Sequence, residues 1–132
     1  VMSGATLENI YISGLALSSS YSFFATTNGA IQWLNVNATA NGTVAITSTA
    51  SQSLDTLMAV GRTLTLTLLV SNGTTAYYPT AWTIDGVSVT PRWIGGTAPT
   101  SGNASSIDIY TLSIIKTAAA TFTVIASQAR AA

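Results

Sequence analysis

The chain contains no cysteine and no histidine among its 132 residues. These absences exclude disulfide frameworks, the Ser-His-Asp triad, the Cys-His dyad and ordinary zinc sites. Charged residues are also scarce, at 6% of the chain against about 25% in an average globular protein. The four acidic and four basic residues cancel to a formal net charge of zero. The four carboxylates that could still catalyse a reaction or bind a metal ion are scattered along the chain. We therefore expect no enzyme, no metal site and no other cofactor.

The lack of net charge also restricts the partners. Nucleic-acid binding needs a basic face that displaces counterions, and attachment to a membrane surface needs a polybasic segment. The sequence shows neither, and no apolar run approaches the roughly 20 residues that span a bilayer. We therefore expect no nucleic-acid partner and no membrane insertion.

Uncharged hydroxyl groups replace charges on much of the polar surface, since the sequence contains 22 threonines and 16 serines. Hydrophobic residues account for another 48%. A soluble monomer normally keeps a mixed, charged surface, whereas permanent subunit interfaces are depleted in charge. The composition therefore predicts a homo-oligomer in which much of the surface contacts other subunits.

Short alternating segments separated by turn residues recur along the chain, which is typical of an all-β protein. We expect a single β-sandwich domain of jelly-roll type over residues 1–132, with one short helix near residues 53–60. Asn28-Gly29 and Asp85-Gly86 each predict a two-residue hairpin, because both residues of such turns adopt positive φ. The expected strands cover residues 7–12, 21–27, 30–36, 43–47, 63–70, 82–84, 87–93, 107–115 and 121–126.

The expected strand over residues 107–115 is apolar on both faces. Alternation places one set of side chains toward the core and the other set on the opposite face, and a strand of this kind is covered on both sides. The second cover comes either from the Gly- and Pro-rich loop of residues 94–106 or from another subunit. The two sets are Tyr110, Leu112 and Ile114 on one face and Ile107, Ile109 and Ile115 on the other.

Aromatic residues provide the candidate contact site. Four of them, Tyr77, Tyr78, Trp82 and Trp93, lie close together in the sequence around one expected hairpin. Exposed flat rings stack on the faces of sugars, which would make them glycan contacts. Packing in the core or at a subunit interface is the alternative, because aromatic side chains supply large apolar areas.

Two carboxylates and a glycine pair receive structural interpretations. Asp85 is expected to form a turn. Asp108 is expected either to pair with Arg92 or to accept hydrogen bonds from amides of the neighbouring loop. Gly95-Gly96 lacks the Lys-Ser/Thr of a phosphate-binding loop, so it is expected to set the backbone geometry beside Trp93.

The second half of the chain carries a series of short motifs. They are I-D-G at 84–86, V-T-P-R-W at 89–93, G-G-T-A-P-T at 95–100, G-N at 102–103, D-I-Y at 108–110, I-I-K-T at 114–117 and T-F-T-V-I-A-S-Q at 121–128. Through these motifs the chain resembles the C-terminal domain of virion structural proteins of marine tailed bacteriophages. The resemblance is close over residues 76–128 and looser over 1–75, where residues 57–61 match best. Ile94 and Ala131 depart from the pattern, which usually has Gln and an aromatic residue there.

The resemblance implies a non-enzymatic protein of the virion surface, either a tail-fibre tip or a capsid decoration or head-fibre subunit. It implies no catalytic residues. It further implies assembly with copies of itself, as a trimer by analogy to phage fibres, and with other virion proteins. A host-surface glycan is the additional partner expected of an attachment protein. Two other classes remain open from the residues alone: a carbohydrate-binding module, and a pilus or surface-layer subunit.

Overall fold

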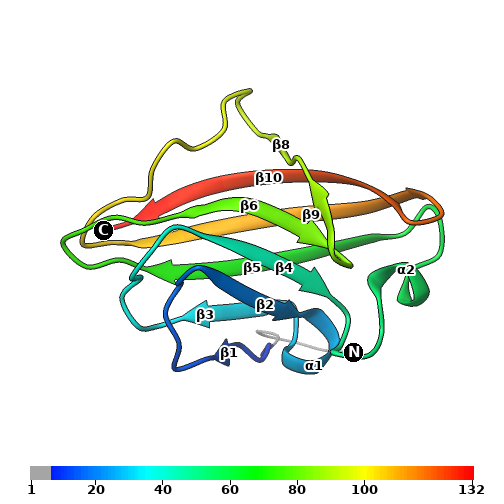
Figure 1. Cartoon of the computed structure of the whole chain (residues 1–132), viewed down its shortest axis with the longest axis horizontal. Coiled ribbons are helices and arrows are strands. Elements are labelled where there is room, and N and C mark those ends of the chain that lie inside the picture. Colours follow the sequence, from blue (N-terminus) through cyan, green and yellow to red (C-terminus); the bar gives the residue numbers. More distant parts are fainter. Residues whose placement is uncertain (1–6) are drawn as a thin grey trace.

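The computed structural model describes residues 7–132, which form an all-β sandwich of two packed sheets (Figure 1). A six-stranded sheet has the order β1-β3-β5-β9-β10-β8, and a four-stranded sheet has the order β2-β4-β6-β7. Their inward side chains form one hydrophobic core. The strands are β1 (Tyr11–Ile12), β2 (Ser20–Phe24), β3 (Ile31–Leu34), β4 (Gly42–Thr47), β5 (Thr63–Ser71), β6 (Pro79–Ile84), β7 (Val87–Val89), β8 (Arg92–Trp93), β9 (Ile107–Ala118) and β10 (Thr121–Ala131).

The first six strands alternate between the two sheets, so β1, β3 and β5 lie in one sheet and β2, β4 and β6 in the other. Neighbouring strands of each set run parallel. A parallel pair needs a long crossover connection, and here a strand of the opposite sheet supplies it. The predicted all-β sandwich is confirmed. Its jelly-roll part is not confirmed, because jelly rolls are built from antiparallel strands.

Asn28-Gly29 does not form the predicted hairpin, because the strands on either side of it belong to different sheets. A single helical turn, α1 (Ala25–Asn28), carries the chain from one sheet to the other. The buried amide of Gln32 holds this crossing: its Nε2 donates to the carbonyl of Gly29 at 2.9 Å. Its Oε1 accepts from the Tyr21 hydroxyl at 2.5 Å. The hydrogen bonds of the buried Gln32 stabilise the crossing, and this outweighs the local preference of Asn28-Gly29 for a hairpin turn.

Asp85-Gly86 forms the expected hairpin between β6 and β7, with φ of 52° and 81° at its two residues. The predicted helix is also present as α2 (Leu54–Leu57), and the Ser53 hydroxyl caps it by accepting from the Thr56 amide. The helix ends at Leu57, before the predicted end near residue 60. Neither helix in the described part of the chain is long and apolar enough to cross a membrane.

The C-terminal half contains the longest antiparallel ladder, between β9 and β10. The strand expected over residues 121–126 extends to Ala131, with Val124 buried and Phe122 packed against the core. The alternation expected over residues 107–115 is also observed, with Tyr110 among the fully buried side chains.

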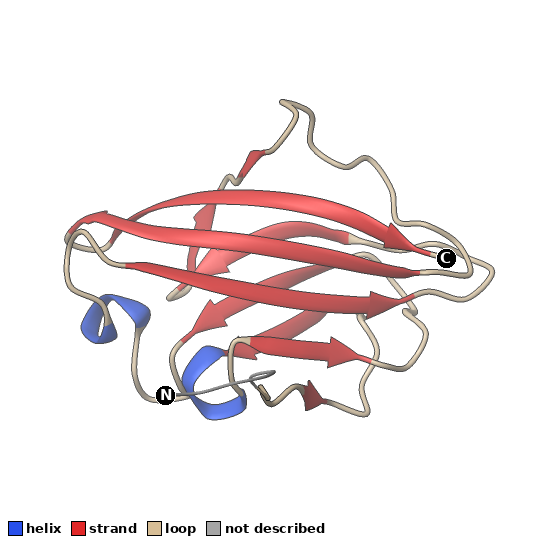
Figure 2. Cartoon of the chain, turned by 180° about the vertical axis from the view of Figure 1, so that it is seen from behind, coloured by secondary structure: helices blue, strands red, loops and turns tan. Residues whose placement is uncertain are grey.

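The loop of residues 94–106 leaves the outward face of β9 open. It is tied to inward-facing side chains instead: the Asn103 amide donates to Asp108 Oδ2 at 2.9 Å, and Gln128 Nε2 donates to the Ser101 carbonyl at 3.1 Å. Figure 2 shows this loop beyond the β10 edge of the sheet, away from its face. Of the two alternatives for covering this face, the loop is therefore wrong. Coverage by another subunit stays a prediction.

Candidate functional site

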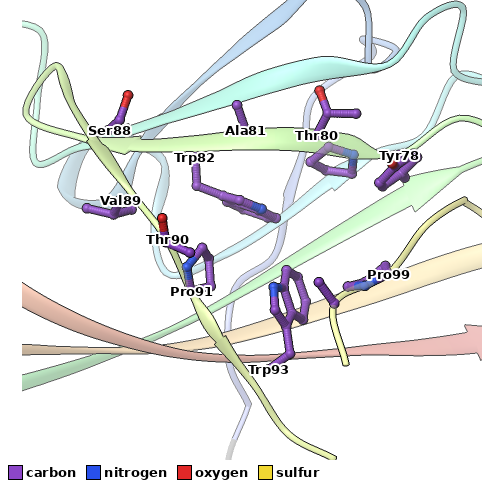
Figure 3. Close-up of a pocket in the computed structure, with 12 residues that line it drawn as sticks. Tyr78, Thr80, Ala81, Trp82, Ser88, Val89, Thr90, Pro91, Trp93 and Pro99 are labelled. Carbon is purple, nitrogen blue, oxygen red and sulfur yellow. The ribbon is translucent and has the colours of Figure 1, made fainter. Parts of the chain in front are cut away.

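A cleft of about 350 Å³ opens at the side of the sandwich where the end of the four-stranded sheet approaches β8. All three prolines of the chain and two of its three tryptophans line this cleft. Among the described residues that line it, none carries a charge. Figure 3 shows the side chains of Tyr78, Trp82, Pro91, Trp93 and Pro99 in the lining, to which Pro79 also belongs.

The cleft exists because the strand expected over residues 87–93 is broken at Pro91. A proline has no amide N–H to donate to a sheet ladder, so strands end at or beside it. Here β7 ends at Val89, and after Pro91 the chain crosses to the other sheet. Arg92 and Trp93 then pair with β10 in parallel. The segment thus bridges the two sheets and places Trp93 on the inward side of β8.

Gly95 and Gly96 turn the chain immediately after Trp93. Both glycines have positive φ, at 90° and 83°, and the Gly96 amide donates to the Trp93 carbonyl at 2.9 Å. An L side chain is strained in this conformation, so the pair sets the backbone path as expected. The turn directs the following loop back so that Ala98 and Pro99 line the cleft.

A buried polar cluster holds the far end of that loop. Asp108 is fully buried and accepts from the Asn103 amide at 2.9 Å, from Asn103 Nδ2 at 2.6 Å and from Asn72 Nδ2 at 3.3 Å. Gly102 lies so close to the Tyr77 carbonyl that an added Cβ would overlap it. Asp108 therefore accepts from a loop amide, as one of the two interpretations of this residue expected, and it anchors the loop that completes the cleft.

The aromatic rings of the cleft also belong to the core. Only 4% of Trp82 is exposed, and its ring lies 5.9 Å from that of Tyr110 and 6.5 Å from that of Trp93. Burial raises the pKa of the Tyr110 hydroxyl far above its usual range. Core packing thus buries most of the Trp82 ring, whereas Trp93 is only half-buried and lies at the cleft.

Both cleft tryptophans keep a hydrogen-bond donor available. In the described chain no buried side-chain nitrogen or oxygen lacks a hydrogen-bond partner. The indole nitrogen of Trp33 donates to the Ser71 hydroxyl at 3.0 Å, whereas those of Trp82 and Trp93 have no acceptor there. The N–H groups of these two residues therefore reach solvent, and the cleft is the open space that their rings line.

Three of the four aromatic residues singled out in the sequence line the cleft: Tyr78, Trp82 and Trp93. Tyr77 does not, because its backbone N–H and carbonyl are both bound by the side chain of Asn72, beside the loop anchor. The prolines were missed as site residues. Their signal was present, since the chain's only prolines all fall within residues 79–99, around the aromatic segment.

Two more carboxylates, those of Asp55 and Asp85, have structural partners. Asp85 accepts from the amides of Leu54 and Asp55 at 2.7 and 3.0 Å, so it caps α2 in addition to forming its turn. Asp55 pairs with Lys116 at 2.7 Å. Within residues 7–132 there is no group of three or more acidic, His or Cys side chains that could hold a metal ion. None of these carboxylates lines the cleft.

Comparison with known proteins finds no matching family model, no matching curated protein and no matching solved structure.

Proposed function

We propose that this chain is a non-enzymatic structural protein of a bacteriophage virion surface, a tail-fibre tip or a capsid decoration or head-fibre subunit. Its primary role is assembly into a homo-oligomer, a trimer by analogy to phage fibres, with attachment to the host as a second role. Placement on a virion is supported by the motifs of residues 76–128. Assembly is supported by the outward face of the six-stranded sheet.

That outward face presents large apolar side chains and almost no charge. The strand registers align Ile12, Trp33, Leu69, Ile109 and Ala129 in one row across five strands. Of the outward-facing side chains in the described strands of this sheet, only Arg92 on the edge strand β8 is charged.

A second copy of the chain is the occupant that fits this face. Two uncharged faces approach each other without burying an unpaired charge, whereas a charged partner would have to be desolvated without compensation. Strand spacing of about 4.8 Å and a rise of about 3.3 Å per residue give this sheet a flat face on the order of 600 Å². Side-chain relief adds to that area, and a standard interface buries about 800 Å² per partner.

The partners of three of the carboxylates support a non-enzymatic role. Asp55, Asp85 and Asp108 all hold irregular segments in place, through an ion pair or through backbone and amide donors. None of them faces another carboxyl group at the cleft, so the paired carboxylates of a glycosidase are missing from the described site.

The test is a charge placed on one sheet face and then on the other. Ile109→Lys introduces a cation in the apolar row, and we expect it to convert the oligomer to a folded monomer. Thr83→Lys is the matched control, because Thr83 lies on the outward face of the four-stranded sheet and is equally half-buried. Light scattering at micromolar concentration measures the mass of each, with a thermal melt to confirm folding.

A monodisperse wild-type monomer would overturn the assembly proposal. An oligomer that persists in Ile109→Lys but dissociates in Thr83→Lys would move the interface to the other sheet. The virion placement is tested separately by the genomic neighbourhood, where capsid and tail genes are expected beside this one.

A further inference from the structure

We propose that the cleft lined by Trp82, Trp93 and the three prolines binds a neutral sugar residue. This inference deepens the attachment role proposed above by naming the class of ligand, but it uses a different surface from the one that carries assembly. Trp93 lies on the inward side of β8, whereas the assembly face is the outward side of the same sheet.

The chemistry of the lining selects an uncharged ligand that has both apolar faces and hydrogen-bond acceptors. An ionic ligand would lose its hydration without gaining a counter-charge, since none of the described lining residues is charged. A pure hydrocarbon would cover the indole N–H groups of Trp82 and Trp93 and leave them unpaired, which costs free energy. A sugar avoids both costs: its C–H faces pack on rings, and its oxygens accept from the indoles.

The size of the cleft fits a compact ligand. Its volume of about 350 Å³ lies at the lower end of the range of about 300–1,000 Å³ for small-molecule sites. A proline-rich peptide is the other ligand that aromatic grooves bind, but it extends about 9 Å for every three residues and needs an open groove. Here the loop residues Ala98 and Pro99 close one side of the cleft.

The cleft is also held in shape before any ligand arrives. Prolines have a fixed φ, β8 is hydrogen-bonded to β10, and the closing loop is anchored to the buried carboxylate of Asp108. A site that is already ordered loses little conformational entropy on binding, which favours even a small ligand with few contacts.

The experiment titrates the full chain with methyl glycosides of glucose, galactose, mannose and N-acetylglucosamine, followed by NMR or calorimetry to about 10 mM. We expect at least one of them to bind. Ala98→Arg fills the mouth of the cleft from an exposed loop position and should weaken that binding at least tenfold. Ala104→Arg is the matched control, because this exposed residue of the same loop does not line the cleft and should leave binding unchanged.

A second pair of variants tests the indole donors directly. Trp93→Phe keeps a ring but removes the N–H, and should also weaken sugar binding about tenfold. Trp33→Phe makes the same change at an indole that already donates to Ser71, and should have no effect on binding.

Absence of binding by every sugar of the panel to the folded protein would overturn the inference. So would binding of a decaproline peptide in place of the sugars, or equal binding by Ala98→Arg and Ala104→Arg. Light scattering on the same samples separates the two proposals. An intact oligomer without sugar binding contradicts only the cleft, and a monomer that binds sugar contradicts only assembly.

Discussion

Each end of β9 holds a neighbouring irregular segment through one buried charged side chain, and the partners of these two side chains differ. At its start, the buried Asp108 accepts hydrogen bonds from Asn72 and Asn103, so a carboxylate is satisfied by neutral donors alone. At its other end, the buried Lys116 pairs with Asp55 at 2.7 Å and holds α2. Both side chains point inward from the same strand.

Lys116 also donates to two backbone carbonyls, those of Asp55 and Met58, each at 2.8 Å. The Asp55 carboxylate is 37% exposed and accepts in addition from the Ala120 amide at 2.6 Å. Hydrogen bonding to Lys116 and Ala120 therefore lowers the pKa of Asp55 despite its exposure.

The difference shows which end should respond to solution conditions. Salt screens a partly exposed ion pair, whereas the neutral amide donors that bind Asp108 carry no charge for salt to screen. The neutral end anchors the loop that closes the cleft. The geometry of the proposed sugar site should therefore be less sensitive to salt than the α2 end.

The largest expected effect comes from Asp108→Ala. Removal of the carboxylate leaves buried donors of Asn72 and Asn103 unpaired, which should lower the free energy of unfolding by about 3 kcal/mol. Chemical denaturation measures this loss, and the released loop should also abolish sugar binding. A variant of wild-type stability would show that water replaces the carboxylate and that this end is not an anchor.

Lys116→Met should cost less, about 2 kcal/mol, because it keeps the apolar stem and leaves two carbonyls without their donor. Hydrogen exchange should localise the change to α2 and leave the loop of residues 94–106 protected. An equal loss of hydrogen-exchange protection at both ends of β9 would contradict the prediction that the two ends are stabilised independently.

At alkaline pH the Asp108 end of β9 should lose stability through Tyr110. Burial raises the pKa of Tyr110, whose hydroxyl accepts from Gln128, the residue that also donates to the loop at Ser101. A raised pKa in the folded state means that stability is complete below the unfolded-state pKa of about 10 and falls as pH rises above it. Tyr110→Phe should flatten that fall in denaturation curves between about pH 9 and 11. The pH dependence of stability that remains in Tyr110→Phe belongs to groups such as Tyr21. Burial raises the pKa of Tyr21 to about 12.

The smallest effect is expected at acid pH, at the charged end. Because the pKa of Asp55 is lowered in the folded state, its contribution is present above the unfolded-state value of about 4 and is lost as pH falls through the folded value. Asp55→Asn should remove this part of the acid dependence and also reduce the sensitivity of the melting temperature to salt. An unchanged acid profile in Asp55→Asn would show that the pair contributes nothing measurable.

Local chemistry in the sequence was a reliable guide where one residue pair decides the outcome. Asp85-Gly86 predicted its hairpin because both residues accept positive φ, and the short helix expected near residues 53–60 is present as α2, whose first turn the Ser53 hydroxyl caps. The same reasoning failed at Asn28-Gly29. There the flanking strands find better partners in different sheets, and a buried Gln32 stabilises the crossing between them.

The candidate site was predictable only in part. Tyr78, Trp82 and Trp93 were recognised as a group and do line one cleft, but Tyr77 lies apart, because the side chain of Asn72 binds both its backbone N–H and its carbonyl beside the loop anchor. The prolines were not recognised, since their role depends on a crossing between sheets that no local pattern records.

The sequence by itself determined the all-β class, the alternation that gives each long strand its inward and outward faces, and the poverty of charge on those faces. These properties follow from residue type and a period of two, which act within a few positions along the chain. The tertiary structure alone decided the parallel pairing of the first six strands, the crossing of the chain between the two sheets after Pro91 and the cleft that this crossing opens. Those features depend on which distant strands share a sheet, and the free energy of that choice lies in non-local packing and buried hydrogen bonds.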